Sequence, residues 1–133
     1  MKPIKPTRDF SQRINELNEQ AYQITQNHGT ERPFSGPHLE EKRLGSFLCV
    51  VCDETLFSSQ HKYDSGSGWP SFFDEAVGAQ ITKKTDHSHG MIRTEVLCGT
   101  CEAHLGHLFP DGPRPTGLRY CINGHALNFK PEV

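Results

Sequence analysis

The sequence contains the same four-residue pattern twice, as CVVC at residues 49–52 and as CGTC at residues 98–101. Each copy ends a short run rich in apolar and β-branched residues, which indicates a strand that finishes in a tight turn. Turns of this kind let two thiolates reach one ion, and four thiolates complete the tetrahedral coordination of Zn²⁺. The spacing therefore predicts a structural zinc site with four ligands, Cys49, Cys52, Cys98 and Cys101.

Two other uses of these cysteines remain open. One of the pairs could be a redox-active dithiol, although such a motif is normally followed by a helix and the second copy would then have no explanation. Both pairs could instead hold an iron–sulfur cluster. The 45 residues that separate Cys52 from Cys98 are more typical of a zinc site.

The composition limits the class of protein. The chain has 133 residues, the size of one domain, and its apolar content of 34% predicts a modest core that a metal would help to stabilise. A net charge of −2 provides no bulk attraction to nucleic acid or to an anionic membrane. No apolar run is long enough to span a bilayer and the first residues lack a secretory signal, so we expect a cytoplasmic protein with reduced thiols.

Two short helices are expected ahead of a β-rich remainder. After a loose tail at residues 1–8, Asp9 and Gln12 have the spacing of a capping box, and Asn18 is a candidate cap for a second helix that stops near His28. From Phe34 onward, turn-forming residues separate short runs that we interpret as strands. These runs are SFLCVVC, TLFSS, AQITKK, MIRTEVLC, HLGHLF, LRYCIN and ALNFK. The sequence thus predicts a single, mostly β domain over residues 1–133, with mostly antiparallel strands.

The fifth cysteine, Cys121, stands outside the two pairs. A lone cysteine is commonly a buried free thiol that packs as a small apolar side chain. Its neighbours favour a reactive thiolate, because Arg119 and Asn123 lie two residues away on the same face of a regular strand. His104 and His107 occur just before it in the sequence, and a nearby cation favours the nucleophilic form of a thiol.

A binding module is the main alternative to an enzyme. Trp69 lies in a glycine-rich loop, SGSGWPSF, where an exposed aromatic ring often contacts a ligand. A zinc-containing β-domain could present this ring in a pocket while Cys121 only packs. A nucleic-acid-binding zinc knuckle would need a basic face with interleaved aromatic residues, and the balanced charge argues against one.

Three segments, together with the two cysteine pairs, resemble the B-type methionine sulfoxide reductases. The segments are GTERPFSG at 29–36, KYDSGSGWPSF at 62–72 and HGMIRTEVLCGTCEAHLGHLFPDGPRPTGLRYCIN at 89–123. The resemblance extends in unbroken order over roughly residues 17 to 130. It implies a fold of two antiparallel β-sheets. It also implies reduction of the R epimer of methionine sulfoxide, free or in oxidised proteins, to methionine.

The resemblance also implies roles for individual polar residues. Cys121 matches the attacking thiolate of the family, which becomes a sulfenic acid in the reaction. His104 and His107 match histidines placed around the sulfoxide oxygen, and imidazole can donate a proton near neutral pH. Asn123 matches the asparagine that orients the site, and Arg119 matches the arginine that favours the thiolate.

Two aromatic residues are expected to contact the substrate. Trp69 matches the family tryptophan whose ring holds the methyl group on the substrate sulfur. Phe109, at the end of the HLGHLF run, is expected to line the same site.

The sequence departs from the family pattern at two positions. Ser67 stands where many members have a cysteine that forms a disulfide with the oxidised nucleophile. Since the other four cysteines are assigned to zinc, an external donor must reset Cys121, either a thioredoxin-type protein or a small thiol such as glutathione. Gly124 replaces a small hydroxyl residue, and the loss of that side chain is expected to loosen the strand after the nucleophile.

Overall fold

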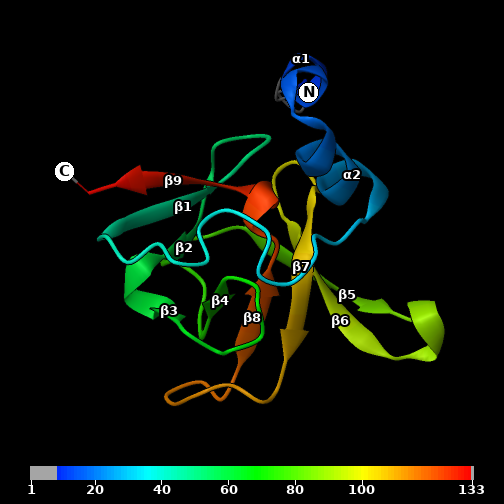
Figure 1. The fold of residues 1–133 in the computed structure, drawn as a ribbon. Coiled ribbons are helices and arrows are strands. Elements are labelled where there is room, and N and C mark those ends of the chain that lie inside the picture. The colour runs from blue at the N-terminus through cyan, green and yellow to red at the C-terminus, as the bar shows by residue number, and fades with distance from the viewer. Residues whose placement is uncertain (1–8, 133) are drawn as a thin grey trace, which may run out of the picture.

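Two antiparallel β-sheets with two short α-helices at one end make up the computed structural model, which describes residues 9–132 (Figure 1). The helices are α1 (Ser11–Glu16) and α2 (Glu19–Asn27). The strands are β1 (Gly45–Cys49), β2 (Thr55–Ser58), β3 (Lys62–Tyr63), β4 (Ser71–Phe72), β5 (Ile81–Asp86), β6 (Arg93–Cys98), β7 (His104–Phe109), β8 (Arg119–Ile122) and β9 (Leu127–Pro131). Short 3₁₀ turns are η1 (Ser59–His61), η2 (Ser88–Gly90) and η3 (Gly124–Ala126). The predicted fold class is confirmed, whereas the predicted tail at residues 1–8 lies outside the described residues.

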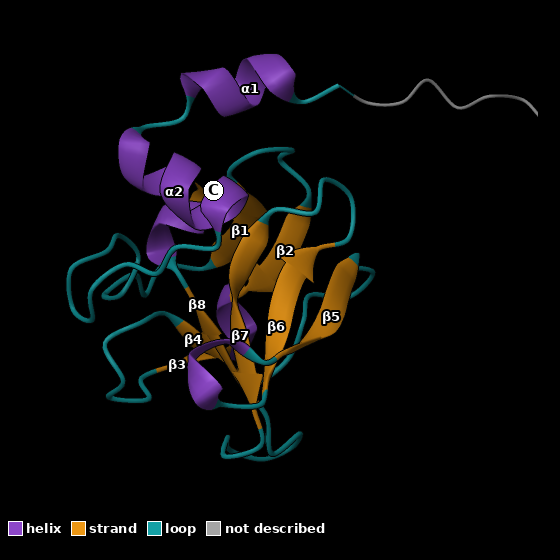
Figure 2. Ribbon diagram, turned by 90° about the vertical axis from the view of Figure 1, so that its right-hand side faces the viewer, coloured by secondary structure: helices purple, strands orange, loops and turns teal. Residues whose placement is uncertain are grey.

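The two sheets differ in size. The smaller sheet has the strand order β2-β1-β9, and the larger has the order β3-β4-β8-β7-β6-β5. Figure 2 shows the strands forming the body of the molecule, with α1 and α2 above them and the loops around the edge. The sequence analysis does not predict β3 and β4, because two-residue strands are too short for an alternating pattern to appear.

The helix ends agree only in part with the sequence analysis. The Asn18 side chain accepts a hydrogen bond from a backbone N–H in the first turn of α2 at 2.8 Å, and His28 ends this helix in the left-handed region at φ 57°. The predicted capping box is wrong, because Asp9 accepts from the backbone and hydroxyl of Ser11 and makes no such pair with Gln12. Within residues 9–132, no helix is long and apolar enough to cross a membrane.

Aromatic rings fill the core between the two sheets. Phe47 and Phe57 come from the smaller sheet, Phe72 and Tyr120 come from the larger one, and all four are almost completely buried. The rings of Phe57 and Phe72 stack at 4.4 Å between centroids, and Phe47 meets Phe72 edge-on at 5.1 Å. Each buried ring stabilises the fold by roughly 1.5–3 kcal/mol relative to an exposed one, so this cluster holds the sheets together.

The long loop between α2 and β1 packs closely against the segment that follows β8. Gly124 is buried, and a Cβ atom placed on it would come within 1.9 Å of the carbonyl oxygen of Pro37. The same loop is fixed by Lys62, whose ammonium donates to the carbonyl oxygen of Leu39 at 2.9 Å. The structure therefore shows tight packing at Gly124 where the sequence suggested a looser strand, because the missing side chain makes room for the loop backbone.

We expect the Gly124→Ser variant, which restores the hydroxyl residue of the family pattern, to destabilise this chain. The added side chain would push against backbone atoms, and overpacking of this kind typically costs about 1–3 kcal/mol in the free energy of unfolding. Urea unfolding should measure the loss, with Asn128→Ser on the exposed side of β9 as a control that changes stability by less than about 0.5 kcal/mol. An unchanged or more stable Gly124→Ser variant would contradict the close packing.

Candidate active site

Strand pairing in the larger sheet places a set of polar side chains on one face. Residues directly opposite each other in antiparallel strands point to the same side of the sheet. Cys121 on β8 lies opposite His107 on β7, and His107 lies opposite Glu95 on β6. Residues two positions further along each strand point to the same face, and here Arg119 lies opposite Phe109. Register therefore brings a thiol, an imidazole and a guanidinium together.

A pocket of about 290 Å³ lies against these side chains. The structure brings six of the seven residues proposed from the sequence for catalysis or substrate binding into its lining. These six are Trp69, His107, Phe109, Arg119, Cys121 and Asn123. The lining also includes residues that the sequence analysis assigned no role in catalysis or binding, namely Thr30, Ser67, Arg93 and Gly106.

The Cys121 thiol is half-buried at the wall of the pocket. Burial raises the pKa of this thiol, because a thiolate is poorly solvated there. The positive charge of Arg119 and hydrogen bonds from Ser67 and Arg119 act in the opposite direction and lower the pKa. The surroundings therefore provide specific groups that stabilise a thiolate in a site that otherwise disfavours charge.

Arg119 is held in place from two sides. Its Nε donates to Asp111 Oδ1 at 2.8 Å and its second terminal nitrogen donates to Oδ2 at 3.2 Å, a two-pronged contact. The guanidinium also lies 4.3 Å from the centre of the Phe109 ring. Asp111 raises the pKa of Arg119 further, so the residue is a fixed positive charge beside Cys121.

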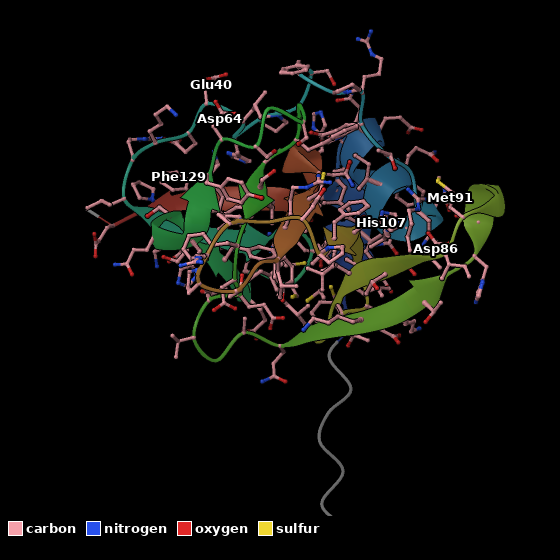
Figure 3. All side chains as sticks on the ribbon, turned by 90° about the horizontal axis from the view of Figure 1, so that it is seen from below. Glu40, Asp64, Asp86, Met91, His107 and Phe129 are labelled. Atoms are coloured by element: carbon pink, nitrogen blue, oxygen red, sulfur yellow. The ribbon has the colours of Figure 1, made fainter. Side chains whose placement is uncertain are left out.

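His107 forms a hydrogen bond with a carboxylate on the neighbouring hairpin. Its Nε2 lies 2.8 Å from Asp86 Oδ2, and Figure 3 shows the two side chains together at the β5–β6 side of the sheet. Hydrogen bonding to His107 holds the pKa of Asp86 well below its usual range. Arg93 lies 3.5 Å from the same carboxylate oxygen. The contact with Asp86 fixes the orientation of the His107 ring.

His104 lies behind the pocket wall and is absent from the lining. Its side chain is 2% exposed, and its Nδ1 is 3.3 Å from the carbonyl oxygen of Ile24 in α2. Burial lowers the pKa of His104 to about 4, so the ring is neutral at neutral pH. The ring centres of His104 and His107 are 5.6 Å apart, which places His104 as a packing partner of the pocket histidine.

The backbone of Glu31 joins two of the pocket residues. Its N–H donates to the Asn123 side-chain oxygen at 3.0 Å, and its carbonyl oxygen accepts from the Trp69 indole N–H at 3.0 Å. The Asn123 amide nitrogen also donates to the carbonyl oxygen of Leu105 on β7 at 2.9 Å. Asn123 therefore connects the loop to the sheet, and Trp69 is fixed at the edge of the pocket.

The two C-x-x-C stretches form matching turns. In each, the residue after the second cysteine has φ 64° and donates its N–H to the carbonyl oxygen of the first cysteine at 2.9 Å; these residues are Asp53 and Glu102. The sulfur atoms of Cys49 and Cys101 are 3.6 Å apart, and those of Cys52 and Cys98 are 3.5 Å apart.

The four sulfur atoms have a spacing that fits a single metal ion. All four lie within 4.8 Å of one another. Bonds of about 2.3 Å in a tetrahedron place thiolate sulfurs about 3.8 Å apart, close to the two distances above. Hydrogen bonds from the neighbouring thiols lower the pKa of Cys98, whereas the contact with Cys101 and burial raise the pKa of Cys49. The donor set can therefore hold a metal ion.

Several residues around the pocket had no role in the sequence analysis. Asp86 and Arg93 reach it because β5 and β6 form a hairpin, and their register cannot be read from the sequence. A partial signal existed, since Arg93 and Glu95 alternate within one predicted strand and therefore share a face. Glu31 acts through its backbone and through its buried side chain, whose Oε1 accepts from the His125 N–H at 3.0 Å, and the sequence does not reveal these contacts.

Comparison with known proteins gives the family. The SelR domain model matches residues 17–131. The chain is 52% identical over 116 residues to "Peptide methionine sulfoxide reductase MsrB" of Agrobacterium fabrum, covering 87% of this chain and 86% of that protein. It is 56% identical over 116 residues to the protein of the same name from Pseudomonas putida, covering 87% of this chain and 87% of that protein. It is also 56% identical over 113 residues to that of Escherichia coli, covering 85% of this chain and 82% of that protein. The chain belongs to the B-type methionine sulfoxide reductase family.

Family membership confirms the resemblance drawn from the quoted motifs. The matched range includes the four paired cysteines, Cys121 and all the residues that line the pocket. The pocket has one thiol at its wall and lies within the matched range. The chain has Ser67 beside that thiol, and the remaining cysteines gather in a separate cluster.

We predict that the Arg119→Gln variant shifts the alkylation of Cys121 to higher pH. Removing the positive charge removes an effect that lowers the pKa of the thiol, so the pKa rises further and less thiolate is present at a given pH. The rate of iodoacetamide labelling at Cys121, followed by peptide mass mapping as the pH is raised, measures this shift. Arg43→Gln, which removes an exposed arginine paired with Glu41, should leave the profile unchanged. Identical profiles for the Arg119 variant and the wild type would refute the electrostatic role.

Proposed function

We propose that this chain reduces methionine-R-sulfoxide, free or within oxidised proteins, to methionine, with Cys121 as the nucleophile. The observation that carries the proposal is the direct pairing of Cys121 with His107 across β8 and β7, in a pocket that also contains Trp69 and Arg119. The names of the relatives support sulfoxide reduction. The choice of the R epimer follows from the family resemblance.

In the proposed reaction the Cys121 thiolate attacks the sulfoxide sulfur. This attack forms a sulfur–sulfur bond while the sulfoxide oxygen takes up one proton. The oxygen then passes to the Cys121 sulfur as the sulfur–sulfur bond and the sulfur–oxygen bond of the substrate break, which releases methionine and leaves Cys121 as a sulfenic acid. Arg119 supports the reactive state because its guanidinium, fixed by Asp111, lowers the pKa of the thiol. Ser67 acts in the same direction through its hydroxyl group.

The oxygen of a sulfoxide leaves only when it is protonated or strongly hydrogen-bonded, and we assign this proton to His107. His107 lines the pocket, and its contact with Asp86 orients the ring and leaves Nδ1 available to the substrate. The sequence analysis proposed the same role for His104. We assign His104 a supporting role, because its ring is 2% exposed and is neutral at neutral pH.

The aromatic residues and Asn123 shape the proposed substrate site. Trp69, fixed through its indole N–H, is placed to pack against the methyl group on the substrate sulfur. Phe109, on the neighbouring strand β7, packs its ring against the Arg119 guanidinium. Asn123 holds the loop after α2 through the backbone N–H of Glu31, and the carbonyl oxygen of the same residue accepts from the Trp69 indole.

We further propose that Zn²⁺ occupies the four-cysteine site and that an external thiol resets Cys121. Four thiolates leave no open position for substrate, so the ion would supply only folding free energy. A multi-iron cluster needs a wider cage than four sulfurs within 4.8 Å, which favours a single ion. With those thiols bound, the remaining donor must come from outside, as a thioredoxin-type dithiol or a small thiol.

The activity is tested with R- and S-sulfoxide substrates and dithiothreitol as the reductant. The wild-type chain should reduce only the R epimer, and Cys121→Ser should reduce neither, because an alcohol at its ordinary pKa is a far poorer nucleophile. Circular dichroism checks that the variant is folded. Full turnover by Cys121→Ser, or turnover of neither epimer by the folded wild type, would overturn the proposal and favour a binding module.

Oxidation with one equivalent of methionine sulfoxide, without reductant, tests the fate of Cys121. Intact mass spectra should show one added oxygen, trapped by a sulfenic-acid reagent. Ser67→Cys should instead give a disulfide with Cys121, since the Ser67 side chain contacts that thiol. Ser11→Cys, on exposed α1, serves as the matched control and should leave the sulfenic acid in place. A disulfide formed rapidly by the wild-type chain would refute the external donor.

Metal analysis and unfolding test the zinc site. Cys98→Ser should lose both the bound zinc and most of the stability, because the free energy of metal binding at such a site contributes directly to folding. Apparent binding free energies are about 10–16 kcal/mol in zinc-finger peptides. Cys121→Ser is the matched control, and it should keep one zinc and unfold at nearly the same urea concentration as the wild type. A stable, zinc-free Cys98→Ser variant with full activity would show that the metal is dispensable.

A further inference from the structure

Three side chains meet where α2 reaches the larger sheet, outside the lining of the Cys121 pocket. His28 ends α2, Glu95 is on β6, and His104 begins β7. Each offers one metal-binding atom, and these atoms lie within 4.8 Å of one another. His28 Nδ1 is 2.6 Å from Glu95 Oε2, and His104 Nε2 is 3.6 Å from the same oxygen.

The contacts of His104 leave an unmatched lone pair facing Glu95. A carbonyl oxygen only accepts hydrogen bonds, so the contact of Nδ1 with Ile24 at 3.3 Å places the ring proton on Nδ1. Because the buried ring is neutral, Nε2 then carries a lone pair directed toward a carboxylate oxygen at 3.6 Å. Two acceptors that face each other in a buried setting are stabilised by a cation between them.

The surroundings of these side chains are those of a metal-binding histidine. A histidine that binds a metal through one nitrogen usually donates its other N–H to a carbonyl or carboxylate, as His104 does to Ile24. The His104 ring is held between the rings of His28 at 5.1 Å and His107 at 5.6 Å. The His28 side chain is 61% exposed, so an ion can enter from solvent and keep water in its remaining positions.

We propose that His28, Glu95 and His104 bind a divalent transition-metal ion of the Zn²⁺ or Co²⁺ type, at a second site separate from the four cysteines. Two imidazoles and one carboxylate suit such ions, whereas Mg²⁺ and Ca²⁺ prefer oxygen ligands. The ion replaces the proton between His28 and Glu95, since both atoms must offer lone pairs to a metal. His28 can move to complete the geometry because it is exposed at a helix end.

Occupation of this site would connect the end of α2 to β6 and β7. The loop that follows His28 contains Thr30, which lines the Cys121 pocket, and Glu31, whose backbone holds Trp69 and Asn123. The ion therefore fixes the start of the loop that forms one wall of the pocket.

Cobalt titration of the chain loaded with one equivalent of zinc, which the four cysteines take up, tests the proposal. Equilibrium dialysis should find about one Co²⁺ bound beyond the zinc, with visible d–d absorption and without the thiolate-to-cobalt charge-transfer band that exchange at the cysteines would give. His28→Asn removes the imidazole and keeps a residue that tolerates the left-handed conformation. This variant and Glu95→Gln should each bind Co²⁺ at least about tenfold more weakly.

The matched control is His87→Asn, which removes an exposed histidine that is outside the three-residue cluster. It should bind the extra Co²⁺ as the wild type does. The proposal is overturned if the wild type binds no Co²⁺ beyond the cysteine site, if His28→Asn binds it with unchanged affinity, or if binding is lost in the His87 variant instead. Circular dichroism of each variant confirms that a loss of binding is not a loss of fold.

Discussion

The contact among four thiols at the junction of the two sheets is the constraint on which the other parts of the structure depend. Cys49 ends β1 in the smaller sheet, and Cys98 ends β6 in the larger one. Fixing these strand ends against each other also fixes the turn that leads from Cys101 to His104, because only two residues separate them. The start of β7, and with it the alignment of the strands beside it, is thus set from the cysteine cluster. In a chain with 34% apolar residues, this cluster adds to the buried aromatic rings that hold the two sheets together.

Alignment of β7 with its neighbours then decides which side chains meet. A register shift of one residue would turn His107 to the opposite face from Cys121. Gly106 allows the close approach, since a Cβ there would lie 2.0 Å from the carbonyl oxygen of Cys121. The pairing of β6 with β7 is also irregular, because the neighbours Val96 and Leu97 pair with Gly106 and His104 and β7 thus has one extra residue. This irregularity lets His104 and His107, three residues apart, bring their rings within 5.6 Å, although a regular strand would place them on opposite faces.

The predictable part of this protein is the part encoded by local patterns. The cysteine spacing predicted that four thiols would lie together. The alternation of side chains along a strand predicted that Arg119 and Asn123 would flank Cys121. The sequence does not show that His107 lines the pocket while His104 lies behind it, because the irregular pairing of β6 with β7 leaves no local pattern. It also overlooked contacts between distant segments, such as Glu31 with Trp69, whose partners are 38 residues apart. The packing of Gly124 against a loop backbone has no signature in the glycine itself.

Charge around the pocket is arranged in two layers. The groups nearest Cys121 are basic, Arg119 and His107, and each is held from behind by a carboxylate, Asp111 or Asp86. A freely rotating guanidinium would stabilise a thiolate only part of the time, whereas Arg119, held by Asp111, remains in place beside the buried thiol. The carboxylates of Asp111 and Asp86 thus fix the positions of Arg119 and His107 beside the thiol.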